Sequence, residues 1–382
     1  MKPDVNRARI ILLTAFISTL TIAGSAARAQ SNPYHLAENW AKLPQGRKFG
    51  AVIGVAVDRG GNIWAFDRCG GDTCAGSKLA PILKFDSSGR LVNSFGAGMF
   101  IFPHGFSVDK DGNAWATDGQ GKDGKGQQVF KFSPDGKVLL TLGKAGVAGA
   151  GEDTFNRPSA VAVAPNGTIF VADGHGGDSN ARIVKFSKYG RFLKAWGKKG
   201  SGPGEFAELH AIAIDSKGRL FVADRGNSRI EIFDQEGKFL DQWKQFGRPS
   251  GIFIDAHDTI YVTDSQSDEK TNPGFQRGIR IGNATDGSVK SLIPSPGPAQ
   301  KPTPEAIAAY APGDPRLEVL LRGATTEGIA ADASGNIYGG EANSMNLRKY
   351  AKYRAAEKPH SKPRMRPKSR NRDIAGGHRN CV

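Results

Sequence analysis

The stretch GVAVDRGGNIWAFD at residues 54–67, followed by ILKFDSSGRLVNSFG at residues 82–96, decides the fold of this chain. In each stretch, apolar residues alternate with others on both sides of a turn that contains glycine. This is the pattern of two antiparallel strands joined by a tight turn. The two stretches together therefore predict a unit of four short strands.

Five further copies of this unit follow. Their first halves read GFSVDKDGNAWATD (105–118), AVAVAPNGTIFVAD (160–173), AIAIDSKGRLFVAD (211–224), GIFIDAHDTIYVTD (251–264) and GIAADASGNIYGGE (328–341). The residues that end the first strands recur every 40 to 77 positions, at Asp58, Asp109, Ala164, Asp215, Asp255 and Asp332. Four strands at about this period are typical of a propeller blade, whose faces only neighbouring blades can cover. We expect an all-β fold, a six-bladed β-propeller over residues 30–352 with four antiparallel strands per blade.

The sixth copy shows only three clear strands. We expect the segment from Leu36 to Lys42 to supply the fourth and to close the ring between the two ends of the domain. A proline-rich excursion over residues 294–315 separates the fifth and sixth blades.

The net charge of +15 lies mostly at the two ends of the chain. Residues 1–29 carry +3 and residues 354–382 carry +7, which leaves only +5 for the part between them. This distribution argues against a nucleic-acid partner for the propeller. Residues 353–382 are basic and interrupted by proline, so we expect a disordered tail, either solvated or attracted to anionic envelope surfaces.

Residues 1–29 have the features of a signal peptide. Arg7 and Arg9 precede the apolar run 10–23, and Ala27-Arg28-Ala29 gives a small-x-small cleavage pattern before Gln30. We expect cleavage near Ala29/Gln30 and a periplasmic or secreted monomer with no stable membrane anchor; an uncleaved anchor is the alternative.

Cys69 and Cys74 enclose a flexible four-residue loop, and an oxidising compartment favours a disulfide between them. A metal site is the alternative for these two thiols, and Cys381 has no evident partner.

The repeat allows equivalent positions to be compared between blades. Five residues before each anchor, where the innermost strand starts, the blades read Ile53, His104, Ser159, His210, Ser250 and Glu327. Alternate blades thus carry metal-ligand side chains, and innermost strands face the central channel. His104, His210 and Glu327 are candidate ligands of one divalent metal ion with an open position, as in catalytic zinc sites. The alternative is that the histidines only cap strand ends.

Ten residues after the anchor, blades one and four carry Arg68 and Arg225, each after an aspartate. A guanidinium at the channel mouth suits a substrate carboxylate, although packing against the aspartate is an equal alternative. His175, in the same region of blade three, is either a titratable group at the rim or an exposed turn residue.

The repeats resemble NHL repeats, as in ADRGNSRI at residues 223–230. More specifically, DR at 67–68, FPHG at 102–105, DGH at 173–175, RIVKF at 182–186 and GEFAELH at 204–210 resemble the peptidyl-α-hydroxyglycine α-amidating lyases. That resemblance implies a channel zinc ion held by three histidines, with two arginines, a tyrosine and a structural calcium ion. His104 and His210 match two zinc ligands, and Arg68 and Arg225 match the arginines.

The chain departs from the family pattern at three positions. The third zinc histidine falls on Glu327, the calcium aspartate on Gly328 and the tyrosine on His175. We expect a zinc-dependent lyase that cleaves a carbon-nitrogen bond of a small-molecule or peptide substrate, with Arg68, His175 and Arg225 as catalytic residues. The alternatives are a non-catalytic propeller that binds a protein, peptide or glycan, and a lactonase-type hydrolase.

Overall fold

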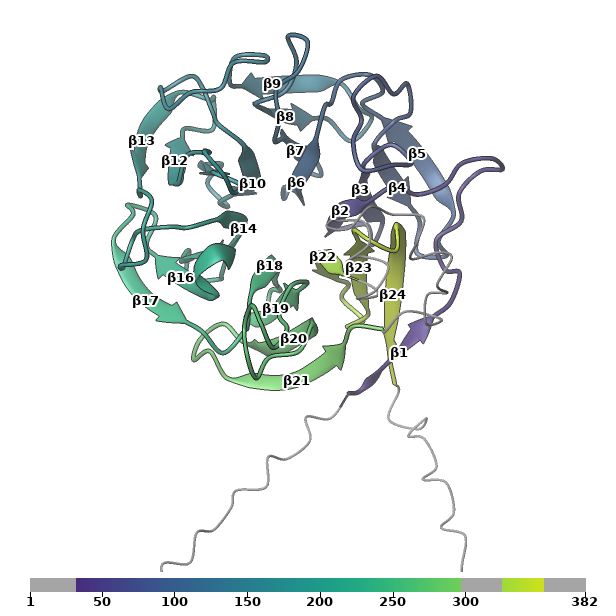
Figure 1. The fold of residues 1–382 in the computed structure, drawn as a ribbon. Helices are drawn as coiled ribbons and strands as arrows, with labels where there is room; N and C mark the ends of the chain where they lie inside the picture. The colour runs from purple at the N-terminus through teal and green to yellow at the C-terminus, as the bar shows by residue number, and fades with distance from the viewer. Residues whose placement is uncertain (1–31, 297–324, 354–382) are drawn as a thin grey trace, which may run out of the picture. The chain divides into compact units, whose positions relative to one another are not determined.

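The structure is a computed structural model that describes residues 32–296 and 325–353. These residues form six four-stranded antiparallel sheets, which stand as blades around a common centre (Figure 1). The predicted fold class, a six-bladed β-propeller, is confirmed.

In the first five blades the strands run from the centre outward in chain order. The first three blades comprise β2 (Val52–Val57), β3 (Ile63–Asp67), β4 (Ile82–Phe85) and β5 (Leu91–Phe95); β6 (Pro103–Val108), β7 (Ala114–Asp118), β8 (Gln128–Phe132) and β9 (Val138–Leu142); and β10 (Pro158–Val163), β11 (Ile169–Asp173), β12 (Arg182–Phe186) and β13 (Phe192–Trp196).

The fourth and fifth blades comprise β14 (Leu209–Ile214), β15 (Leu220–Asp224), β16 (Arg229–Phe233) and β17 (Phe239–Trp243); and β18 (Pro249–Ile254), β19 (Thr259–Asp264), β20 (Gly278–Asn283) and β21 (Val289–Pro294). A single 3₁₀ turn, η1 (Arg225–Asn227), follows β15 in the described part of the chain. The sixth blade comprises β22 (Thr326–Ala331), β23 (Ile337–Glu341), β24 (Asn346–Lys352) and, as its outer strand, β1 (Tyr34–Ala37).

The ring closes through the N-terminal strand. β1 pairs antiparallel with β24, with Tyr34 opposite Lys352 and Ala37 opposite Lys349. The sequence predicted this closure but placed the strand slightly late, at residues 36–42. Asn39 adopts a φ of 53°, which ends the extended conformation earlier.

A repeated aspartate builds the turn between the first two strands of a blade. In blade one, Asp58 Oδ1 accepts a hydrogen bond from the backbone N–H of Asn62 (2.9 Å), and Trp64 Nε1 donates to Asp58 Oδ2 (3.1 Å). Asp109, Asn113 and Trp115 repeat this arrangement in blade two. The turn thus satisfies its own backbone donor and anchors an aromatic ring of the core.

A second repeated aspartate, at the end of the second strand, positions the functional region. Asp118 accepts hydrogen bonds from the backbone N–H groups of Ile101 (2.8 Å) and Phe102 (2.6 Å). Asp224 does the same for the backbone of Ala207 (3.0 Å) and Glu208 (3.3 Å). Each aspartate therefore fixes the segment that leads into the innermost strand of its own blade.

The predicted signal peptide, nearly all of the excursion and of the basic tail, and Cys381 lie outside the described residues. Among the described residues there is no helix long and apolar enough to cross a membrane.

Candidate metal centre

The six innermost strands surround a central cavity of about 240 Å³. His104, His210 and Glu327 line it, each as the second residue of its strand, β6, β14 and β22. The three positions that are equivalent in the sequence repeat therefore lie at one level of the channel.

His175 reaches the same region from a loop. It follows β11 and stands in Gly174-His175-Gly176-Gly177, whose three glycines all have φ values between 56° and 147°. A Cβ at Gly174 would lie 1.9 Å from the carbonyl oxygen of Asn180, so the loop requires glycine there. The backbone directly before His175 is therefore closely packed.

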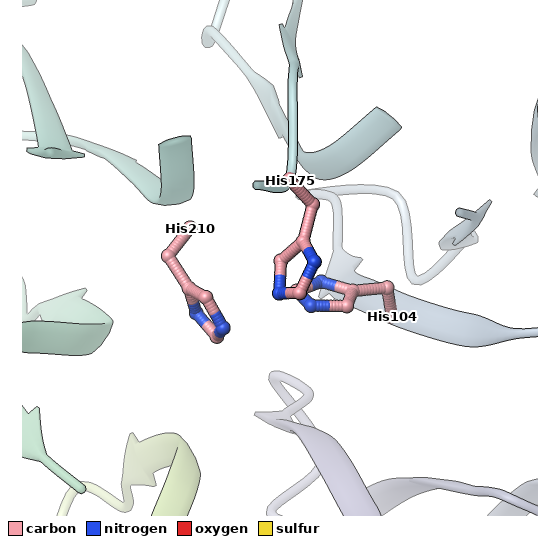
Figure 2. Close-up of side chains that lie close together, drawn as sticks. All are labelled: His104, His175 and His210. Atoms are coloured by element: carbon pink, nitrogen blue, oxygen red, sulfur yellow. The ribbon is translucent and has the colours of Figure 1, made fainter. Parts of the chain in front are cut away.

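The structure brings His104, His175 and His210 together, as Figure 2 shows. One nitrogen of each ring lies within 4.8 Å of the others. The ring centroids are 4.3 Å apart for His104 and His175, 4.7 Å for His104 and His210, and 5.1 Å for His175 and His210. Three imidazole nitrogens at such separations form a candidate site for one metal ion.

Two of the imidazoles are oriented by backbone carbonyl groups. His104 Nδ1 lies 2.7 Å from the carbonyl oxygen of Ser159, and His210 Nδ1 lies 2.6 Å from that of Ser250. A carbonyl oxygen only accepts, so both Nδ1 atoms carry the proton and both Nε2 atoms present a lone pair. Both Nε2 atoms are buried and have no hydrogen-bond partner among the described residues. This arrangement fits a bound metal ion, because a buried nitrogen that contacts neither a hydrogen-bond donor nor a metal ion reduces the stability of the fold.

Burial keeps all three imidazoles neutral. It lowers the pKa of His104 and of His210 well below the usual value, and neighbouring histidine and arginine side chains lower them further. Burial, Arg225 and Arg68 lower the pKa of His175 to about 3. Neutral imidazole is the form that binds metal ions.

Glu327 lies beside the three histidines. Its Oε2 is 3.9 Å from His210 Nε2, and its Oε1 is 3.7 Å from Arg225 Nη1. The side chain is only 14% exposed. It is therefore placed to receive a proton or to contact an ion held by the imidazoles, and its predicted role as a ligand stays a prediction.

Arg225 is buried and held by Glu208, a residue that the sequence analysis missed. Arg225 Nη2 donates to Glu208 Oε1 (2.8 Å) and Nε donates to Oε2 (3.2 Å). Nη2 also lies 3.3 Å from His175 Nε2. The signal for Glu208 was its position two residues before His210, where no other blade carries an acidic residue.

Arg68 lies next to the strand that carries His104. Its Nε donates to the carbonyl oxygen of Pro103 (3.0 Å), and its guanidinium lies 3.7 Å from the centre of the Phe102 ring. Nη1 donates to Asp72 Oδ1 (2.7 Å), a carboxylate that is 74% exposed. The adjacent aspartate, Asp67, is not its partner; it accepts from the backbone N–H of Gly50 (2.5 Å).

The predicted disulfide between Cys69 and Cys74 is present. It closes the loop that carries Asp72 and follows Arg68 directly. The bridge therefore supports the position of a site arginine.

The residue at position 328 does not fit the calcium ligand that the resemblance implied. A Cβ at Gly328 would lie 2.9 Å from the backbone of Ile53, Gly54 and Val55, so a carboxylate at this position would displace β2.

Comparison with known proteins matches residues 152–242 to a family model described as "6-bladed beta-propeller". The mouse (Mus musculus) peptidyl-glycine alpha-amidating monooxygenase is 37% identical over 203 residues, which cover 47% of this chain and 20% of that protein. The chain is a six-bladed β-propeller with amidating-lyase relatives. One of these, the peptidyl-alpha-hydroxyglycine alpha-amidating lyase 1 of Drosophila melanogaster, is 37% identical over 170 residues, or 40% of this chain and 30% of the fly protein.

The human NHL repeat-containing protein 3 is also similar, at 32% identity over 206 residues, or 52% of this chain and 56% of that protein. The predicted resemblance to NHL repeats and to amidating lyases is confirmed. The chain spans about a fifth of the mouse protein and less than a third of the fly protein.

Proposed function

We propose that this chain is a zinc-dependent lyase that cleaves the carbon-nitrogen bond of an N-acyl-α-hydroxyglycine, giving an amide and glyoxylate. The observation that carries the proposal is the convergence of His104, His175 and His210, two of which present buried Nε2 lone pairs without a partner. Relatives named amidating lyases support this reaction class.

The three imidazoles would hold the metal, so His175 takes the place that the sequence analysis gave to Glu327. Three nitrogen donors with an open position are typical of catalytic zinc. When bound, zinc would act as a Lewis acid toward the substrate hydroxyl group and lower its pKa.

Glu327 is then available as the general base. Its carboxylate borders His210 and Arg225, within reach of a group bound over the imidazoles. It would take the proton of the substrate hydroxyl group as the carbon-oxygen double bond forms. The carbon-nitrogen bond breaks, its electron pair goes to nitrogen, and nitrogen takes a proton to complete the amide.

Arg68 and Arg225 would bind the substrate carboxylate. Among the described residues, Arg68 Nη2 and Arg225 Nη1 form no hydrogen bond, although Arg225 Nη1 lies 3.7 Å from Glu327 Oε1. The other guanidinium nitrogens are fixed by their contacts. Two fixed guanidinium groups with spare donors suit a carboxylate, and burial strengthens the interaction.

Glyoxylate release tests this proposal. Purified mature protein, supplied with zinc, should convert N-benzoyl-α-hydroxyglycine to benzamide and glyoxylate, and His104→Ala should lower kcat/KM at least 100-fold. His257→Ala is the matched control, because His257 lies exposed in the turn between β18 and β19. No glyoxylate from zinc-loaded wild-type protein would contradict the proposal.

We further propose that the protein acts after export. The disulfide between Cys69 and Cys74 is in keeping with an oxidising compartment, as the sequence of residues 1–29 predicts. Cell fractionation with N-terminal sequencing should find the chain outside the cytoplasm and beginning near Gln30.

A further inference from the structure

Two arginines that the proposed reaction does not use occupy one repeat position. Two residues before the level of the channel histidines, the six blades carry Ala51, Phe102, Arg157, Glu208, Arg248 and Thr325. Arg157 in blade three and Arg248 in blade five thus stand on either side of Glu208 in blade four. A propeller blade does not need arginine here, because four blades lack it.

The backbone at both positions is fixed. The backbone N–H of Arg157 donates to Gln127 Oε1 (2.7 Å). Arg157 also adopts a φ of 65°, which is unusual for a residue other than glycine. The N–H of Arg248 donates to Asp264 Oδ2 (3.1 Å), the strand-end aspartate of its blade. The backbone that carries each guanidinium group is therefore held in place.

Both arginines border the candidate metal centre. Arg157 Nη1 donates to the carbonyl oxygen of His175 (3.2 Å). Ser159, two residues after Arg157, orients His104, and Ser250, two residues after Arg248, orients His210. Each arginine is thus connected to an imidazole of the site through a single short segment.

Neither arginine has a carboxylate partner at ion-pair distance among the described residues, whereas Arg225 between them is paired with Glu208. Arg248 has only an amide oxygen, Gln266 Oε1, at 3.2 Å, and its Nε is buried without a described partner. Burial and the nearby charge of Arg225 lower the pKa of Arg248, whereas the carboxylates of Glu208, Asp264 and Asp268 raise it. Two half-buried guanidinium groups without an ion-pair partner favour a bound anion.

We propose that Arg157 and Arg248 bind a second anionic group of the substrate, located on the acyl part that leaves as the amide. The inference rests on the proposed function, because Arg68 and Arg225 would already bind the glycine carboxylate. The preferred substrate is then a dianionic N-acyl-α-hydroxyglycine. A guanidinium group binds a carboxylate or a phosphonate in the same way. The two arginines therefore specify that the second group of the substrate is an anion, and they do not specify which anion it is.

Binding of unreactive analogues tests the inference without depending on turnover. N-succinylglycine carries the second carboxylate, N-butanoylglycine lacks it, and N-(3-phosphonopropanoyl)glycine replaces it with phosphonate. Isothermal titration calorimetry of the zinc-loaded mature protein should find both dianionic analogues about 10- to 100-fold tighter than N-butanoylglycine, the range expected for hydrogen bonds to a charged group. A preference limited to one dianion would identify the group as carboxylate or phosphonate.

Arg157→Gln and Arg248→Gln should each reduce the preference for dianions about tenfold and leave the affinity for N-butanoylglycine within twofold. Arg191→Gln is the matched control, since Arg191 lies exposed in the turn between β12 and β13. A merely structural role would weaken all three analogues equally. Equal affinity of wild-type protein for mono- and dianionic analogues would overturn the inference, even if a variant failed to fold. A preference for dianions without glyoxylate release would leave it standing and reject the lyase reaction.

Discussion

Replacing Glu208 with glutamine should destabilise the propeller, because it removes the main counter-charge of a buried arginine. Arg225 is 4% exposed, and its two hydrogen bonds to Glu208 are 2.8 and 3.2 Å long. Two charges about 4 Å apart interact by about 4 kcal/mol at an effective dielectric constant of 20. Glu327, 3.7 Å from Arg225, would compensate in part, and a glutamine oxygen would keep one hydrogen bond. The expected loss is therefore about 2 kcal/mol, below the range for a fully broken buried pair.

Urea unfolding followed by tryptophan fluorescence measures this loss. With an m-value of about 3 kcal/mol/M, the midpoint should fall by roughly 0.7 M. Glu152→Gln is the matched control, since the Glu152 side chain is exposed and forms no ion pair among the described residues, so the change should leave the midpoint nearly unaltered. If Glu208→Gln were as stable as Glu152→Gln, Glu208 would not hold Arg225 in solution, and the placement of that arginine would be refuted.

Three further predictions concern the fold. Replacing Cys69 and Cys74 with serine should lower the free energy of unfolding by about 2 kcal/mol, as expected for so short a loop, and urea unfolding under non-reducing conditions measures it. Burial raises the pKa of the Asp118 carboxyl group to about 6 in the folded protein, above its value of about 3.9 in the unfolded chain. The folded protein therefore binds the proton of this carboxyl group more tightly than the unfolded chain does. Wild-type protein should therefore lose up to about 3 kcal/mol relative to Asp118→Asn as the pH rises from about 4 to about 6, and an unchanged difference would contradict the shift. Deleting β1 should expose the edge of β24 and cause aggregation or a lower Tm, measured by light scattering and circular dichroism.

The sequence predicted the fold because the period of the repeat can be measured within this one sequence. Every blade shows the same alternation and five of the six carry the turn aspartate, with Ala164 in blade three, so residues such as Asp58 and Asp109 identify corresponding strands without reference to any other protein. The closing strand was placed only approximately, because β1 is a lone outer strand whose limits depend on its pairing with β24 and on the turn at Asn39.

The sequence also predicted the level at which His104, His210 and Glu327 lie, since equivalent strand positions face the same part of the channel. It did not predict that His175 joins the other two histidines. That contact depends on a glycine-rich loop specific to blade three, which has no equivalent to compare.

The sequence also did not predict that Arg225 pairs with Glu208. Each site arginine follows an aspartate, Asp67 or Asp224, and the sequence left open whether that neighbour or a substrate carboxylate is its partner. Both aspartates are instead used by backbone N–H groups, which leaves Arg225 to Glu208 of the preceding loop. Contacts between side chains across a channel depend on the direction of each side chain, which strand periodicity does not determine.

The metal content of three proteins tests the central claim, that the imidazoles of His104, His175 and His210 form one metal centre. Wild-type protein purified with zinc and dialysed should contain about one zinc ion per chain by inductively coupled plasma mass spectrometry. His175→Ala should reduce this well below half, and Glu327→Ala should retain it. Zinc lost from Glu327→Ala but kept in His175→Ala, or no zinc in the wild-type protein, would contradict the account.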